Sequence, residues 1–175
     1  MDTLFLDRDG VINVQLVGDY VKCADELLLR DDFLRAIPLL KRHFKRFIVI
    51  TNQQGIAKGI CTTEQVNAVH QYLRQQLADN KLIINAIYFC PHLAGSGCDC
   101  RKPETGMMRQ ALADFPDIRL DQSFMVGDSL TDMQFGKRAG VPTAFIGKVT
   151  QENRADVLAN STLIVSSVLE FAQKL

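Results

Sequence analysis

Short runs of apolar residues alternate along the chain with longer segments of helical period. The runs are continuous in apolar character, which is typical of strands that are covered on both faces. They predict strands at Thr3–Leu6, Phe47–Ile50, Ala86–Phe89, Phe124–Val126, Thr143–Ile146 and Leu163–Val165.

The segments between these runs carry apolar residues at the spacing of one helical face. The clearest helix begins at Thr62, where Gln65 completes a capping box. Its apolar stripe consists of Val66, Val69, Leu73 and Leu77. Further helices are predicted near Phe33–Phe44, Met107–Phe115, Thr131–Ala139 and Val168–Lys174. Pro38 lies inside the first of these patterns and obscures where that helix begins and ends.

This alternation predicts an α/β fold with a doubly wound, mostly parallel sheet and helices on both of its faces. No repeat, low-complexity tract or linker divides the 175 residues, so we expect a single domain over residues 1–175. In such sheets ligands bind beyond the carboxyl ends of the strands. Three predicted strands are followed there by polar residues: Asp7 and Asp9, Thr51 and Asn52, and Asp128.

Two carboxylates, Asp7 and Asp9, follow the first predicted strand. Like charges this close raise each other's pKa, so the pair is typical of a cation site. Mg2+ suits it because Mg2+ takes oxygen ligands and accepts phosphate as a co-ligand. Taken singly, Asp7-Arg8-Asp9-Gly10 is more typical of a turn than of a metal site, and Ser129 with Asp132 of a helix cap. The position of each motif after a strand favours Mg2+-dependent phosphoryl transfer.

Charge and composition limit the partners. Twenty lysines and arginines balance 20 aspartates and glutamates, so no global field draws the chain to nucleic acid or a membrane, and a small molecule is the expected partner. No apolar run approaches the roughly 20 residues that span a bilayer. The acidic start, Met1-Asp2-Thr3, has no features of a secretory signal. Five cysteines, three of them in one short loop, favour metal binding in a reducing compartment, and we expect the cytoplasm.

The loop of residues 90–100 holds three thiols and one imidazole. These four side chains can close a tetrahedral Zn2+ site with no position left for water, and they are Cys90, His92, Cys98 and Cys100. The alternative is that Cys90 ends a buried strand and the others are free thiols, although a polar, glycine-rich loop offers little to bury them against. Arg101 and Lys102 follow the last ligand, so a structural zinc would determine where both cations point.

Together, Asp-x-Asp, Thr-Asn, a later lysine and Gly-Asp-x-x-x-Asp resemble the four motifs of the haloacid dehalogenase superfamily. For a phosphoric monoester hydrolase of that superfamily, the resemblance implies that Asp7 is the nucleophile, forming an aspartyl-phosphate, and that Asp9 is the acid and base. It implies phosphoryl stabilisation by Thr51 and Lys102. It implies Mg2+ ligands in the Asp7 carboxylate, the Asp9 carbonyl and Asp128, with Asp132 supporting the metal or orienting Lys102.

Longer stretches, Asp7–Asn13, Gly18–Val21, Thr51–Gly59 and Cys90–Pro103, are similar to the branch that contains the heptose-bisphosphate and histidinol-phosphate phosphatases. The branch lacks a large cap domain and carries a zinc-binding loop. The resemblance implies removal of the 7-phosphate of D-glycero-D-manno-heptose 1,7-bisphosphate, in nucleotide-heptose synthesis for lipopolysaccharide or other surface glycans. Substrate contacts are implied for Tyr20, Asn52, Gln53, Gln54 and Arg101.

Two alternatives stay open. The short interval between His92 and Cys98 is typical of the histidinol-phosphate enzymes, and Ser129 stands where some heptose enzymes have a lysine. From another class, a phospho-receiver or a zinc-stabilised binding module would share the sheet and the acidic cluster without turnover, but it would have no use for an intact Asp7 and Asp9 pair. We expect a monomer, since no subunit is needed to close a site without a cap.

Overall fold

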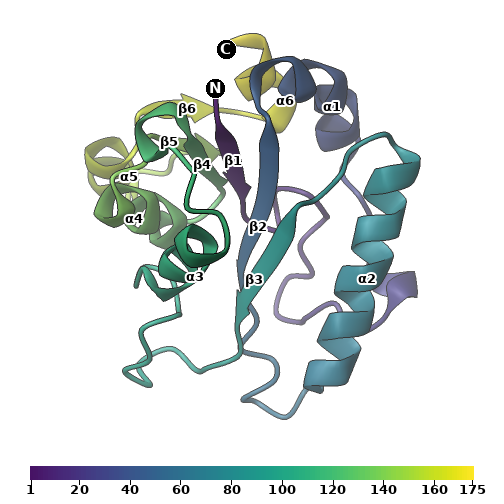
Figure 1. Cartoon of the computed structure of the whole chain (residues 1–175). Coiled ribbons are helices and arrows are strands. Elements are labelled where there is room, and N and C mark those ends of the chain that lie inside the picture. The colour runs from purple at the N-terminus through teal and green to yellow at the C-terminus, as the bar shows by residue number, and fades with distance from the viewer.

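The computed structural model describes residues 1–175 and contains one six-stranded sheet in the order β3-β2-β1-β4-β5-β6 (Figure 1). Every neighbouring pair of strands is parallel, which confirms the predicted sheet. The strands are β1 (Thr3–Leu6), β2 (Arg46–Asn52), β3 (Ala86–Cys90), β4 (Phe124–Gly127), β5 (Thr143–Ile146) and β6 (Leu163–Val165).

The five predicted helices are confirmed, with ends that differ by one or two residues. The helices are α1 (Asp31–His43), α2 (Thr63–Asp79), α3 (Gly106–Asp114), α4 (Leu130–Ala139), α5 (Arg154–Asn160) and α6 (Val168–Gln173), with 3-10 turns η1 (Ala24–Glu26) and η2 (Leu120–Gln122). The capping box of Thr62 and Gln65 is present, and α1 continues through Pro38. The sequence pattern missed α5 because only Val157 is fully buried in it. None of the helices combines the length and apolar character needed to cross a membrane.

The sheet separates two layers of helices. Helices α1, α2 and α6 supply the larger apolar cluster on one face, and α3 and α4 supply the cluster on the other. Strand β1 contributes to both, since Leu4 and Leu6 face the first cluster and Phe5 faces the second. Burial on both faces explains why the strands are apolar at every position.

The order of the strands creates a crevice at one edge of the sheet. After β1 the chain winds outward through β2 and β3, and it then returns to form β4 on the other side of β1. Loops leaving β1 and β4 therefore diverge, and such a switch point is the usual ligand site of a doubly wound sheet. The loop after β3 lies at the same edge, the lower one in Figure 1.

Candidate active site

A cleft of about 330 Å3 opens at this switch point. Nearly all of the residues predicted to act on a phosphorylated substrate line it: Asp7, Asp9, Tyr20, Thr51, Asn52, Gln54, Arg101, Lys102, Asp128 and Asp132. They come from the end of β2 and from segments after β1, β2, β3 and β4, so the sheet brings together residues up to 125 positions apart in the sequence.

Lys102 is a buried cation held between two carboxylates. Its Nζ lies 2.7 Å from Asp7 Oδ1 and 2.6 Å from Asp132 Oδ1. It also donates to the carbonyl of Ile50 at 2.7 Å. Burial favours the neutral amine, but Asp132 and Asp7 outweigh it and raise the pKa of Lys102 above its usual range. Lys102 therefore stays charged beside the floor of the cleft.

Asp132 contacts Lys102 through one carboxylate oxygen and caps helix α4 through the other. Asp132 Oδ2 accepts a hydrogen bond from the backbone N–H of Ser129 at 3.1 Å, and the two side chains complete a capping box at the start of α4. The helix-cap interpretation of Ser129 and Asp132 is thus correct, and Asp132 orients Lys102 as well.

Three carboxylates meet at the floor of the cleft. Oxygens of Asp7, Asp128 and Asp132 lie within 4.8 Å of one another. Burial raises the pKa of Asp7 to about 8, against the opposing charge of Lys102, and Asp132 and Asp128 raise it further. Burial and then Asp132 raise the pKa of Asp128 to about 7. One lysine does not offset this concentration of negative charge, and a donor set made of oxygens fits a hard divalent cation.

Gly10 gives Asp128 its room in the cleft. Its backbone has φ of +86°, a left-handed conformation that favours glycine. A Cβ at this position would collide with the Asp128 carboxylate. The glycine of the Asp-x-Asp-Gly motif therefore serves both the turn after β1 and the acidic cluster.

Asp9 lies two residues from Asp7 in a different environment. Its Oδ2 accepts from Arg8 Nη2 at 2.8 Å and from Gln53 Nε2 at 2.9 Å, and its Oδ1 accepts from Asn13 Nδ2 at 2.9 Å. Burial works to raise its pKa, but the charge of Arg8 and the hydrogen bonds from Asn13 and Gln53 outweigh burial and lower it. The pKa values of the two aspartates are therefore pushed in opposite directions.

The four predicted zinc ligands converge beside the cleft. Their ligand atoms lie within 4.8 Å of one another, and the members of this cluster are Cys90, His92, Cys98 and Cys100. The sulfur of Cys90 lies 3.6 Å from that of Cys98 and 2.9 Å from that of Cys100, and none of the three forms a disulfide. Burial raises the pKa of the Cys90 thiol to about 12. A cation would be needed to keep this thiol ionised near neutral pH, and a set of three sulfurs and one imidazole fits Zn2+.

Proteins of known name resemble this chain along most of its length. Residues 99–171 match a family described as HAD-hydrolase-like. A Mycobacterium tuberculosis protein named D-glycero-alpha-D-manno-heptose-1,7-bisphosphate 7-phosphatase is 40% identical over 131 residues, 75% of this chain and 69% of that protein. A Salmonella typhi protein named D-glycero-beta-D-manno-heptose-1,7-bisphosphate 7-phosphatase is 36% identical, and the alignment covers 98% of this chain and 96% of the relative. The chain belongs to the heptose-bisphosphate phosphatase family.

A solved structure of this family has the same fold. The D,D-heptose 1,7-bisphosphate phosphatase from B. bronchiseptica, complexed with magnesium and phosphate, matches 99% of this chain and 97% of its own with a TM-score of 0.84 and 32% identity. The resemblance inferred from the motifs is therefore confirmed, and the protein is a phosphoric monoester hydrolase with an HAD-like fold.

Gln53 differs from its prediction as a substrate contact. Its side chain is buried and does not line the cleft. It donates instead to Asp9 Oδ2 and to Thr51 Oγ1, both at 2.9 Å. Gln53 follows β2 directly, and these two hydrogen bonds hold its amide beneath the cleft.

Asn52 lines the cleft, but its amide is already engaged. Its Oδ1 accepts from the backbone N–H of Lys102 at 3.0 Å, and its Nδ2 donates to the Lys102 carbonyl at 3.2 Å. The side chain thus ties the end of β2 to the segment that follows the cysteine loop.

Sequence reasoning missed two features of the site. Arg8 is fully buried beneath Asp9, whereas arginine between two aspartates usually indicates a solvated turn. Lys58 also lines the cleft, and its Nζ lies 3.1 Å from the hydroxyl of Tyr20. The sequence carries no signal for this contact, because the two residues are 38 positions apart and the fold brings them together.

Proposed function

We propose that this protein removes the 7-phosphate of D-glycero-D-manno-heptose 1,7-bisphosphate, with Mg2+ as cofactor, in the synthesis of nucleotide-activated heptose for surface glycans. The observation that carries the proposal is the Asp7, Lys102 and Asp128 cluster at the floor of the switch-point cleft. Relatives named as heptose-bisphosphate 7-phosphatases at 36–40% identity support the choice of substrate.

The reaction proposed has two steps. Asp7 attacks phosphorus, so that an oxygen–phosphorus bond forms to Asp7 while the bond to the sugar oxygen breaks, and Asp9 gives that oxygen a proton. Asp9 then takes a proton from water, which attacks the phosphorus, releases inorganic phosphate and restores the Asp7 carboxylate. Asp7, Asp128 and the carbonyl of Asp9 would hold Mg2+, which when bound neutralises charge on the phosphoryl oxygens.

Two polar groups support the phosphoryl oxygens in this scheme. Lys102 favours the ionised, nucleophilic form of Asp7, and its charge lies where negative charge develops. Thr51 Oγ1 accepts a hydrogen bond from Gln53, which leaves its own hydroxyl hydrogen free to be donated toward the cleft.

The second phosphate of the substrate requires cations away from the reacting centre. Arg101 and Lys58 line the cleft, and neither forms an ion pair with a carboxylate. A guanidinium can hold a phosphate through two parallel hydrogen bonds, so we assign the non-reacting phosphate to Arg101. Tyr20 and Gln54 would contact the sugar between the two phosphates.

We further propose that Cys90, His92, Cys98 and Cys100 hold a structural Zn2+. The ligand set supports it, and Arg101 and Lys102 follow the last ligand directly, so that closure of the loop would orient both cations. Residues 1–175 are proposed to form one domain that acts as a monomer, since one chain supplies the whole cleft. Five unpaired cysteines favour a reducing compartment such as the cytoplasm.

Phosphate release by the protein with Mg2+ and Zn2+ tests the substrate. We expect kcat/KM for the heptose bisphosphate to exceed that for histidinol phosphate by roughly a hundredfold or more. Histidinol phosphate has no second phosphate, so it would lose the charge-assisted contact proposed for Arg101. Both anomers of the sugar are assayed, because the named relatives include alpha and beta enzymes. A preference for histidinol phosphate would overturn the proposed substrate and indicate histidine biosynthesis.

A further inference from the structure

Arg8 is the largest fully buried side chain of the protein, and the reaction proposed above does not use it. Its Nη2 donates to both oxygens of Asp9, at 2.8 and 3.0 Å, and its Nε donates to Asp9 Oδ1 at 3.2 Å. A planar fork of this kind determines the orientation of a carboxylate as well as its position. Only 22% of the Asp9 side chain is exposed, so it meets the cleft at one edge.

The third nitrogen of Arg8 is held from helix α2. Nη1 lies 3.2 Å from Nε2 of His70, which is 62 residues away in the sequence. A guanidinium has only donors, so Nε2 must accept the hydrogen bond and the imidazole must be neutral, with its proton on Nδ1. Burial and the nearby charge of Arg8 lower the pKa of His70 to about 3, which agrees with a neutral ring.

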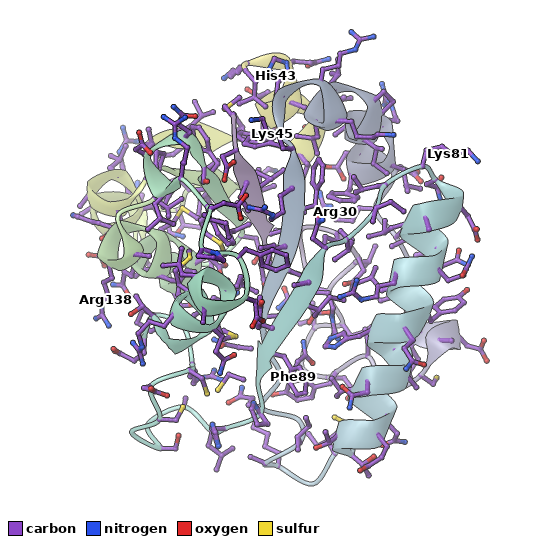
Figure 2. The ribbon with its side chains drawn as sticks, viewed as in Figure 1. Arg30, His43, Lys45, Lys81, Phe89 and Arg138 are labelled. Atoms are coloured by element: carbon purple, nitrogen blue, oxygen red, sulfur yellow. The ribbon has the colours of Figure 1, made fainter.

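His70 is itself fixed by packing. It is 6% exposed, and its ring stands edge-on to that of Phe89, with 5.4 Å between the ring centroids. Figure 2 shows Phe89 near the lower end of β3, on the side of the sheet that α2 covers. Neither His70 nor Phe89 lines the cleft, so this support lies behind the site.

We propose that Arg8 and His70 are positioning residues that hold Asp9 in the orientation needed for proton transfer to the leaving oxygen. The inference rests on the proposed function, in which Asp9 is the acid and base. His70, together with Gln53, limits rotation of the guanidinium. The guanidinium in turn limits rotation of the carboxylate, which also accepts hydrogen bonds from Asn13 and Gln53. Neither residue touches the substrate. A side chain left to rotate would spend much of its time away from the leaving oxygen, and proton transfer needs hydrogen-bond reach.

The test separates proton transfer from the rest of the reaction through the leaving group. His70→Leu removes the acceptor for Arg8 Nη1, whereas His70→Gln keeps an acceptor in its amide oxygen. Each variant is assayed in a single turnover with enzyme in excess, so that release of the leaving group is followed apart from hydrolysis of the aspartyl-phosphate, which needs Asp9 as base with either substrate. The two substrates are the heptose bisphosphate, whose alkoxide leaving group needs a proton, and 4-nitrophenyl phosphate, whose phenolate leaves without one. Thermal unfolding of each variant is measured in parallel.

We expect His70→Leu to lower the single-turnover rate of leaving-group release from the sugar substrate by roughly tenfold, part of the 10²- to 10⁴-fold that a positioned acid contributes. Its KM for the sugar substrate, and its single-turnover rate with 4-nitrophenyl phosphate, should change less than about twofold, and His70→Gln should recover most of the loss. Equal loss on both substrates, or a change in stability alone, would overturn the inference and leave Arg8 and His70 as purely structural.

A second variant keeps the test decisive if His70→Leu does not fold. Arg8→Lys retains the buried charge but not the planar fork, and the same split between substrates is expected. A wild-type protein that hydrolyses neither substrate would instead overturn the proposed function, and with it this inference. If the wild type is active and the variants lose activity equally on the heptose bisphosphate and on 4-nitrophenyl phosphate, only the positioning role is wrong.

Discussion

Asp7 and Asp9 illustrate how one loop can give two carboxylates opposite chemistry. Asp7 faces Asp128 and Asp132 in a buried cluster, and its pKa is raised to about 8. Asp9 accepts hydrogen bonds from Arg8, Asn13 and Gln53, and its pKa is lowered. Asp7 must be ionised to attack and Asp9 must be protonated to act as the acid, which is the reverse of these two directions in the metal-free protein. The proposed roles therefore require the cation that the cluster would hold beside Asp7, and the negative charge of the substrate beside Asp9.

The raised pKa values predict how Mg2+ and pH act together. Asp7 and Asp128 have pKa values of about 8 and about 7 in the folded protein, whereas the ordinary value is 3.8. At a pH between 3.8 and about 8, the metal-free folded state therefore binds more protons than the unfolded state. Stability contributed by these groups therefore falls as pH rises toward 8. Mg2+ binds the ionised carboxylates, so we expect saturating Mg2+ to raise Tm more at pH 8 than at pH 6. An equal increase at both values would contradict the account.

Gly10 offers a test of how closely the cluster is packed. Gly10→Ala should abolish the effect of Mg2+ on Tm and most phosphatase activity, because the new methyl group would displace the Asp128 carboxylate. Gly59→Ala is the matched control, since Gly59 also has positive φ, +69°, but nothing lies within 4 Å of a Cβ there. Both variants should lose roughly 1–2 kcal/mol from backbone strain. Retained Mg2+ binding in Gly10→Ala would disprove the close approach.

Among the elements, those with strong local signals were predicted well. The cap of α2 at Thr62 and the apolar run of β1 depend on residues that are neighbours in the sequence. Helix α5 buries only Val157, so its pattern carried no signal. The burial of Arg8 could not be predicted, because it depends on His70 of α2 and on Gln53, which the fold brings to it from afar. Likewise, the position of Gln53 beneath the cleft depends on its hydrogen bonds to Asp9 and Thr51.

The cysteine loop links the end of β3 to helix α3. Gly106 packs so closely on the backbone of Asp99 and Cys100 that a Cβ would lie 2.5 Å from the Asp99 carbonyl oxygen. Lys102 ties the same end of the loop to Asn52 through its backbone N–H and carbonyl. Strand β3 fixes the other end at Cys90, and a metal within the loop would stiffen the segment that carries Arg101 and Lys102.

Removal of one proposed zinc ligand tests this role. Cys98→Ala should lose bound zinc, measured by elemental analysis, and should lower kcat by roughly tenfold or more, because small displacements of a charge-stabilising group are costly. The Mg2+-dependent rise in Tm should remain. Cys23→Ala, which changes an exposed cysteine outside the loop, is the control and should keep zinc and activity. Normal turnover by a zinc-free Cys98→Ala protein would remove the proposed link between zinc and catalysis.

For the molecule as a whole, the parallel sheet is what assembles the site. Crossing from β3 back to β4 places Asp7 and Asp128 at the ends of adjacent strands, and the loop after β3 brings Lys102 between Asp7 and Asp132. Strand ends on rigid elements hold such groups more accurately than free loops do. Among the charged residues that line the cleft, Asp7, Lys102 and Asp132 are buried, whereas Lys58 is exposed.

The central claim is that Asp7 performs nucleophilic phosphoryl transfer, and Asp7→Asn tests it most directly. Asparagine has nearly the same shape but cannot form the aspartyl-phosphate, so phosphate release from the heptose bisphosphate should fall more than roughly a thousandfold while the variant remains folded. Lys102→Met, measured alongside, should lower the rate without abolishing it. A folded Asp7→Asn protein that still released phosphate at a rate near that of the wild type would contradict the account.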